Sequence, residues 1–76
     1  MPFIHIYAVS GRDLETKKKA AQAIVKAASA EMGAPETAFT VAYEEFEREN
    51  WSPEVAKTIV EPMRDKLLIE GGKLVV

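Results

Sequence analysis

Three residues of this 76-residue chain could converge to support chemistry, namely Pro2, Arg12 and Trp51. Pro2 directly follows Met1, and a proline at the first residue of a strand needs no function, because its missing N–H costs little there. If Met1 is removed, however, the proline nitrogen changes from an inert amide into a basic secondary amine. The rest of the chain has to decide between these two interpretations.

Pro2 and Arg12 flank one alternating apolar segment, FIHIYAV at residues 3–9, which predicts a strand. At about 3.3 Å per residue, an extended chain places Pro2 and Arg12 about 33 Å apart. They therefore cannot share a site within one subunit unless the chain folds sharply back. An adjacent subunit could bring its Arg12 to this Pro2, although the sequence alone does not require it.

The remaining polar side chains carry weaker signals, and we interpret them as solvated groups or ordinary strand residues. His5 is interpreted as a packed or surface residue of a strand, Arg64 as a surface residue, and Lys17, Lys18 and Lys19 as a solvated helix face. Glu44, Glu45, Glu47 and Glu49 are expected to form a solvated loop face after the second strand. The sequence contains no glycine-rich phosphate loop, no metal-ligand cluster and no Ser/His/Asp set. We therefore expect neither a metal nor a cofactor.

A helix over residues 14–32 is predicted after the first strand. Asp13 has the position of an N-cap, Gly33 that of a C′ residue, and apolar positions recur at helical spacing between them. Residues 37–43 alternate again and predict a second strand. A strand, a helix and a strand form a β-α-β unit, so the two strands should be parallel. Because two strands make a marginal sheet, we expect a second subunit to extend it.

The last third of the chain predicts less regular structure. Ser52-Pro53 begins a short helix or turn at residues 53–58, and Pro62 is expected to interrupt it. A second short helix would then run from Pro62 to about Glu70 and end at two glycines. The tail KLVV would either pair with a neighbouring subunit or remain loose.

Bulk composition predicts one domain over residues 1–76 that is helped by assembly. A chain of this size buries only about 60% of its unfolded surface, and it has no cysteine with which to form disulfides. A net charge of −2 argues against a nucleic-acid partner. No apolar run is long enough to span a membrane, and no signal peptide is evident, so we expect a cytoplasmic protein.

The order of several segments resembles the 4-oxalocrotonate tautomerase family, closest to its small dimeric bacterial subgroup. The segments that carry this resemblance are MPFIHIYAV, SGRDLETKKKAAQAIVKAAS, MGAPETAFTVAYEEF and ENWSPEVAKTIVEPMRDKLLIEGG. The resemblance implies an α+β, β-α-β tautomerase fold with parallel strands, a sheet extended across subunits and a short C-terminal helix. It also implies a homo-oligomer, with a dimer favoured over a hexamer because of the longer C-terminal segment.

The resemblance further implies roles for individual residues. Pro2 would be the general acid–base, Arg12 would bind a substrate carboxylate across a subunit boundary, and Trp51 stands where hexameric members have an active-site phenylalanine. Thr40 stands where the family has a second arginine. This departure disfavours a dicarboxylate substrate and favours a smaller or monocarboxylate enol.

An apolar pocket would suit the chemistry that this resemblance implies, and Phe3, Val9, Phe39 and Trp51 are its expected walls. An α-amino group has an ordinary pKa of about 7.7–8.0. Desolvation and the nearby Arg12 cation would both lower the pKa of the Pro2 amine, leaving it neutral and basic at pH 7. The implied reaction is keto–enol tautomerisation of a 2-oxo carboxylate.

Two alternatives remain open at the level of sequence. A hydratase or dehalogenase could use the same scaffold, but such enzymes use additional arginines, and Thr40 occupies one of the expected positions. The chain could also be a non-enzymatic, oligomeric binding module, for which replacing Pro2 would change no activity.

Overall fold

The computed structural model describes residues 1–76, and the chain divides into two compact units, Met1–Phe46 and Glu47–Val76. None of the helices combines the length and the apolar character that crossing a membrane requires.

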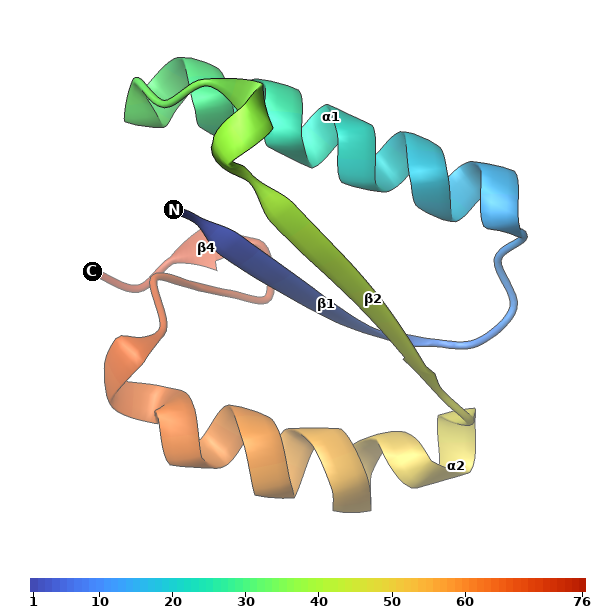
Figure 1. Ribbon diagram of the computed structural model, residues 1–76. Helices are drawn as coiled ribbons and strands as arrows, with labels where there is room; N and C mark the ends of the chain where they lie inside the picture. The colour runs from blue at the N-terminus through green and yellow to red at the C-terminus, as the bar shows by residue number, and fades with distance from the viewer. The chain divides into compact units, whose positions relative to one another are not determined.

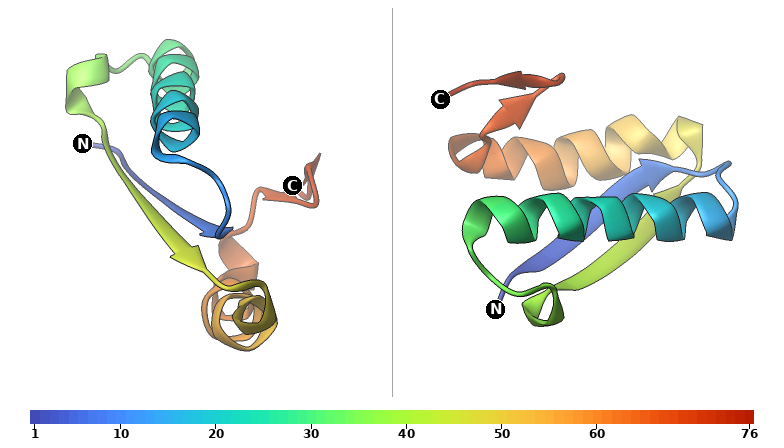
Figure 2. Two further views of the ribbon diagram at one scale, coloured as in Figure 1. Left: turned by 90° about the vertical axis from the view of Figure 1, so that its right-hand side faces the viewer. Right: turned by 90° about the horizontal axis from the view of Figure 1, so that it is seen from above.

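The first unit is a β-α-β motif. Strand β1 (Phe3–Val9) is followed by helix α1 (Leu14–Met32), the short 3₁₀ helix η1 (Glu36–Ala38) and strand β2 (Thr40–Phe46). The two strands pair in parallel, and α1 lies along one face of the pair (Figures 1 and 2). The prediction of parallel strands joined by a helix is confirmed.

The predicted caps define both ends of α1. The Asp13 carboxylate accepts a hydrogen bond of 2.9 Å from the Thr16 backbone N–H, which satisfies one of the free donors of the first turn. At the other end Gly33 adopts a left-handed φ of 69°, and its N–H donates to the Ser29 carbonyl at 3.1 Å. A residue with a Cβ would be strained in this conformation, so a glycine ends the helix here.

Strand β2 begins three residues later than the sequence pattern predicts. The residues after Pro35 form η1 first, where the Ala38 N–H donates to the Pro35 carbonyl and the Phe39 N–H donates to the Glu36 carbonyl. The strand consequently includes Glu44 and Glu45, and the prediction that these two residues lie in a solvated loop is wrong.

The two faces of the sheet differ in composition. On the face toward α1 lie Ile4, Ile6, Ala8, Val41, Tyr43 and Glu45. Lys17 of α1 joins the helix to this face, because its Nζ lies 2.7 Å from the Glu45 carboxylate and 5.5 Å from the centre of the Tyr43 ring. On the opposite face lie Phe3, His5, Tyr7, Val9, Thr40, Ala42, Glu44 and Phe46.

A continuous helical stretch begins the second unit, and it contradicts the prediction of a break at Pro62. Helix α2 (Arg48–Asn50) leads into the π-helix η2 (Trp51–Val60) and then into the 3₁₀ helix η3 (Glu61–Lys66). Pro62 cannot donate a backbone hydrogen bond, so the i→i−5 bonding ends with the Glu61 N–H on the Ala56 carbonyl. The chain stays helical because proline's fixed φ suits the first turn of the 3₁₀ segment that follows.

A small antiparallel hairpin ends the second unit and replaces the predicted end of the last helix. Its strands are β3 (Ile69–Glu70) and β4 (Lys73–Leu74), so the helix expected up to Glu70 ends earlier. The turn uses Gly71 and Gly72 at φ values of 58° and 82°. The tail KLVV therefore pairs within its own chain.

Candidate active site

Pro2 directly precedes β1, at the end of the sheet where both parallel strands begin; we call this the open end. Its carbonyl accepts a hydrogen bond of 3.2 Å from the Thr40 backbone N–H, so the first residue of β2 holds the residue that precedes β1. Pro2 is half-buried, whereas the Met1 side chain is fully exposed. With Met1 attached, the Pro2 nitrogen is an amide and has no basicity.

Three of the predicted site residues share this end of the sheet with Pro2. Phe3 is 64% exposed and lies opposite Thr40 in the strand register, and Phe39 directly precedes β2 and is half-buried. Thr40 is exposed. The structure therefore brings Phe3, Phe39 and Thr40 to the same end of the sheet as Pro2, and none of these residues is an arginine.

Arg12 and Val9 lie at the opposite end of β1. The Arg12 Nη1 donates a hydrogen bond of 3.2 Å to the Val9 carbonyl, and the arginine side chain is exposed. Gly11 allows the turn between them at a φ of 132°. The seven residues of β1 separate this end from Pro2 by about 23 Å, at about 3.3 Å per residue. Pro2 and Arg12 of one chain are thus not brought together.

Trp51 belongs to the second unit, where it is the first residue of η2 and is half-buried. In this unit only Val55 is almost completely buried, at 1% exposure. Trp51 therefore lies within the helical stretch that begins at Arg48, at the point where the π-helix starts.

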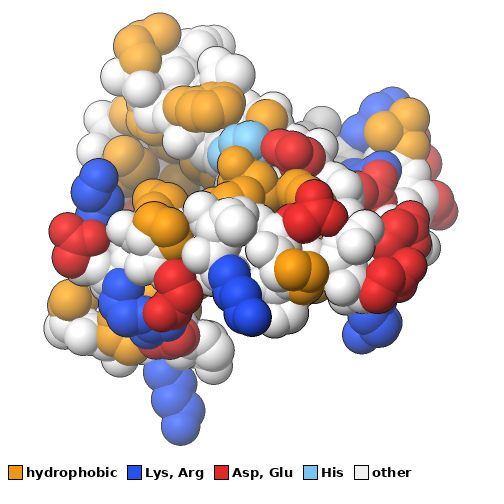
Figure 3. All heavy atoms as spheres, turned by 90° about the horizontal axis from the view of Figure 1, so that it is seen from below, with side chains coloured by type: hydrophobic (Ala, Val, Ile, Leu, Met, Phe, Trp, Pro, Cys, Tyr) orange, Lys and Arg blue, Asp and Glu red, His pale blue; other side chains and the backbone are white.

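A cross-strand pair of His5 and Glu44 was missed by the sequence analysis. The His5 Nε2 lies 2.8 Å from the Glu44 carboxylate, and the imidazole stacks on Tyr7 with 4.2 Å between ring centres. Figure 3 shows the single histidine at the surface beside an acidic side chain. In the parallel register His5 lies opposite Ala42, and Glu44 is two residues further along the same face. A correct register of β2 would therefore have revealed the pair. The contact ties β1 to β2.

Charged groups near Arg12 are already engaged in structural contacts. The hydrogen bonds from Thr16 hold the pKa of the Asp13 carboxyl below its usual value, and no ion pair joins Asp13 to Arg12. In the second unit, hydrogen bonds to Glu61 and Glu70 raise the pKa of Arg64. The Arg12 side chain makes one hydrogen bond, which goes to a backbone carbonyl, and it has no carboxylate partner.

No group of three or more His, Cys, Asp or Glu side chains is placed to hold a metal ion.

Comparison with known protein families gives one match. The sequence model of a family described as "Tautomerase enzyme" matches residues 2–58, which is more than half of the chain. The matched region starts at Pro2 and includes both strands of the first unit, Arg12, Thr40 and Trp51. No curated protein matches the sequence.

Proposed function

The chain belongs to the tautomerase family, and on this basis we propose that it is a keto–enol tautomerase, similar to 4-oxalocrotonate tautomerase, in which Pro2 is the general acid–base once Met1 has been removed. The observation that carries the proposal is that the family match begins at Pro2, the residue whose carbonyl is fixed by Thr40 at the open end of the sheet. We place the reaction in the cytoplasm and expect no cofactor.

The proposed reaction moves one proton and needs no other reactant. The neutral Pro2 amine takes the proton from the hydroxyl of an enol, the oxygen electron pair forms the carbonyl, and the double-bond electrons take a proton from Pro2 at carbon. The reverse sequence forms the enol. Because the same amine accepts and donates, it works best with a pKa close to the ambient pH.

Arg12 is proposed to bind the substrate carboxylate through a bidentate pair of hydrogen bonds. Since Pro2 and Arg12 of one chain lie at opposite ends of β1, the arginine would come from a second copy. Two features of the first unit support assembly: each strand has an unpaired edge, and none of residues 1–46 is fully buried. We favour a dimer over a hexamer, and analytical ultracentrifugation would distinguish them.

Thr40 is proposed to limit the substrate to one carboxylate. It lies beside Pro2, where a cation would be needed to hold a second carboxylate, and its side chain is neutral. Phe3 and Phe39 would form apolar walls at this end, while Val9 would form one at the Arg12 end. Trp51 would exclude water from the substrate and donate its indole N–H. The proposed substrate class is a small or monocarboxylate 2-oxo acid and its enol.

The test is a direct assay of processed protein. Intact-mass spectrometry first establishes that Met1 has been removed, and ultraviolet absorbance then follows ketonisation of an arylenolpyruvate. We expect Pro2→Ala to lower kcat by about 10²–10⁴-fold, the usual contribution of general acid–base catalysis. Pro35→Ala, which changes a proline before η1, is the matched control and should keep its activity. Turnover that survives in Pro2→Ala, or none in processed wild-type protein, would remove Pro2 from the mechanism.

A further inference from the structure

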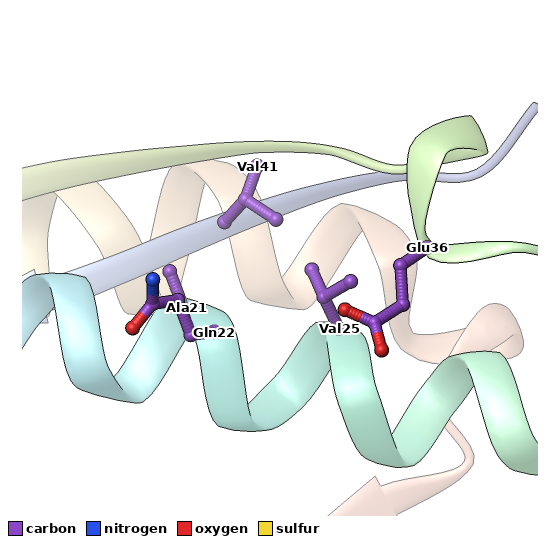
Figure 4. A pocket seen from close by; sticks show the side chains of 5 residues that line it. All are labelled: Ala21, Gln22, Val25, Glu36 and Val41. Atoms are coloured by element: carbon purple, nitrogen blue, oxygen red, sulfur yellow. The ribbon is translucent and has the colours of Figure 1, made fainter.

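A hollow lies between α1 and β2, on the sheet face that the helix covers (Figure 4). Its volume of about 190 Å³ corresponds to about six water molecules at ~30 Å³ each. Its lining residues are Ala21, Gln22, Val25, Glu36 and Val41. None of them is a residue that we assign to proton transfer, so a ligand here would be additional to the tautomerase substrate.

The lining combines an apolar surface with two polar groups. Val25 of α1 and Val41 of β2 face each other across the hollow, and the Glu36 side chain reaches from η1 toward the helix beside Val25 (Figure 4). The Gln22 carboxamide and the Glu36 carboxylate lie on opposite sides of Val25 (Figure 4). A ligand would therefore meet a carboxylate at one end and mainly methyl groups along its length.

Glu36 has no cationic partner in the structure. The five ion pairs use Glu15, Glu44, Glu45, Glu61 and Glu70. A carboxylate beside an apolar surface favours an ammonium group, because a charge-assisted hydrogen bond is stronger than a neutral one. The methyl groups favour an aliphatic body, because removing each methylene from water is favourable.

We propose that this hollow binds a primary alkylammonium ion of four or five carbons, with the ammonium group on Glu36 and the alkyl chain between Val25 and Val41. Butylammonium and pentylammonium have five and six heavy atoms, which matches a space of about six waters. A carboxylic acid of the same length would be repelled by Glu36, and an alcohol would lack the charge.

The first experiment measures amide chemical shifts of ¹⁵N-labelled protein during titration with n-butylammonium chloride at fixed ionic strength. We expect saturable shifts at Ala21, Val25 and Val41 with a millimolar dissociation constant. Binding should tighten about three- to fourfold for each methylene from propyl to pentyl, as expected for burial of a CH₂ group. 1-Butanol should bind about fivefold more weakly, and butyrate should not saturate. Equal binding of butanol and butylammonium, or no saturation, would overturn the proposal.

Variants test the role of the carboxylate. Glu36→Gln should bring the dissociation constant of butylammonium to that of butanol, whereas Glu49→Gln, the same charge change in the second unit, should leave it unaltered. Unchanged affinity in Glu36→Gln would overturn the proposal. Shifts at Val25 and Val41 that grow with protein concentration in the absence of amine, and that added amine does not reverse, would assign the hollow to another copy instead. The readout does not depend on turnover, so it can be repeated in Pro2→Ala protein.

Discussion

The two units differ in what defines the ends of their elements. In Met1–Phe46 a side chain or glycine marks each end of the helix, and the strands are held by a continuous parallel ladder. In Glu47–Val76 the helical bonding changes from i→i−5 to i→i−3 where Pro62 lacks a donor, and Arg64 hydrogen-bonds to Glu61 on η3 and to Glu70 on the hairpin. Element ends marked by side chains are easier to predict than ends set by a missing donor.

Arg12 in the first unit and Arg64 in the second differ in the groups to which they donate hydrogen bonds. Arg64 makes hydrogen bonds to two carboxylates, whereas Arg12 donates only to the Val9 carbonyl. An arginine that is already neutralised has little charge left for a substrate anion. Arg12 therefore has more of its charge available for a substrate anion than Arg64 has.

In the comparison of the two units, the largest effect is expected from Arg12→Ala. Arg12→Ala should lower kcat/KM for an enol carboxylate by about 10- to 100-fold, because hydrogen bonds to charged groups contribute about 1.5–3 kcal/mol. Arg64→Ala should stay within about twofold of wild type. Steady-state kinetics of both variants, with sedimentation to show an unchanged assembly, makes the comparison. Similar losses in the two variants would contradict the assignment of Arg12.

A smaller effect is expected from the glycine that ends α1. Gly33→Ala should lower the free energy of unfolding by about 1 kcal/mol, because an alanine is strained at a φ of 69°. No atom lies within 4 Å of the added Cβ, so we expect no steric clash in addition. Urea denaturation measures the change. Gly72→Ala, at a φ of 82° in the hairpin, should instead speed local amide exchange around β4. The prediction would be contradicted if Gly72→Ala lowered the free energy of unfolding and Gly33→Ala did not.

The Asp13 cap should make the first unit sensitive to acid. Its folded-state pKa is lowered from 3.8, so the stabilisation it provides is present above the unfolded-state pKa and is lost as the pH falls through the folded-state pKa. Asp13→Ala should therefore lower Tm by a few degrees at pH 7, and the difference from wild type should shrink below about pH 4. Asp65→Ala, in the second unit, is the control. A difference that stays constant down to pH 2 would show that the carboxylate's charge is irrelevant.

The smallest effect is expected from the cross-strand pair. Glu44→Gln should change the free energy of unfolding by about 0.5 kcal/mol or less, because the two side chains are 31% and 51% exposed. In the second unit, Glu70→Gln should mainly accelerate exchange of the Val75 amide, which donates to the Leu68 carbonyl beside the hairpin. Thermal denaturation and hydrogen exchange measure the two effects. A loss above 2 kcal/mol in Glu44→Gln would mean that the pair is a major part of the fold.

The sequence allowed good prediction of β1, α1 and the parallel strand order, because alternation and the caps Asp13 and Gly33 are local signals. The start of β2 was misplaced because the η1 turn after Pro35 competes with the extended pattern. Pro62 was interpreted as a break because a missing donor does not reveal that its fixed φ still fits a 3₁₀ turn.

The candidate site was predictable only in part, because some of its contacts depend on how β2 is aligned with β1. The separation of Pro2 and Arg12 followed from the length of one strand. The proximity of Thr40 to Pro2 and the pairing of His5 with Glu44 depend on the register of β2, which a strand pattern shifted by three residues cannot provide.

The hydrogen bond from Thr40 to the Pro2 carbonyl has a consequence for the entropy of activation. The pyrrolidine ring fixes one backbone torsion of Pro2, and this bond restrains the other. A terminal amine held in this way would have the direction of its lone pair set before substrate arrives. The loss of conformational freedom during proton transfer would then fall mainly on the substrate, whose carboxylate we propose to be bound by Arg12 of a second chain.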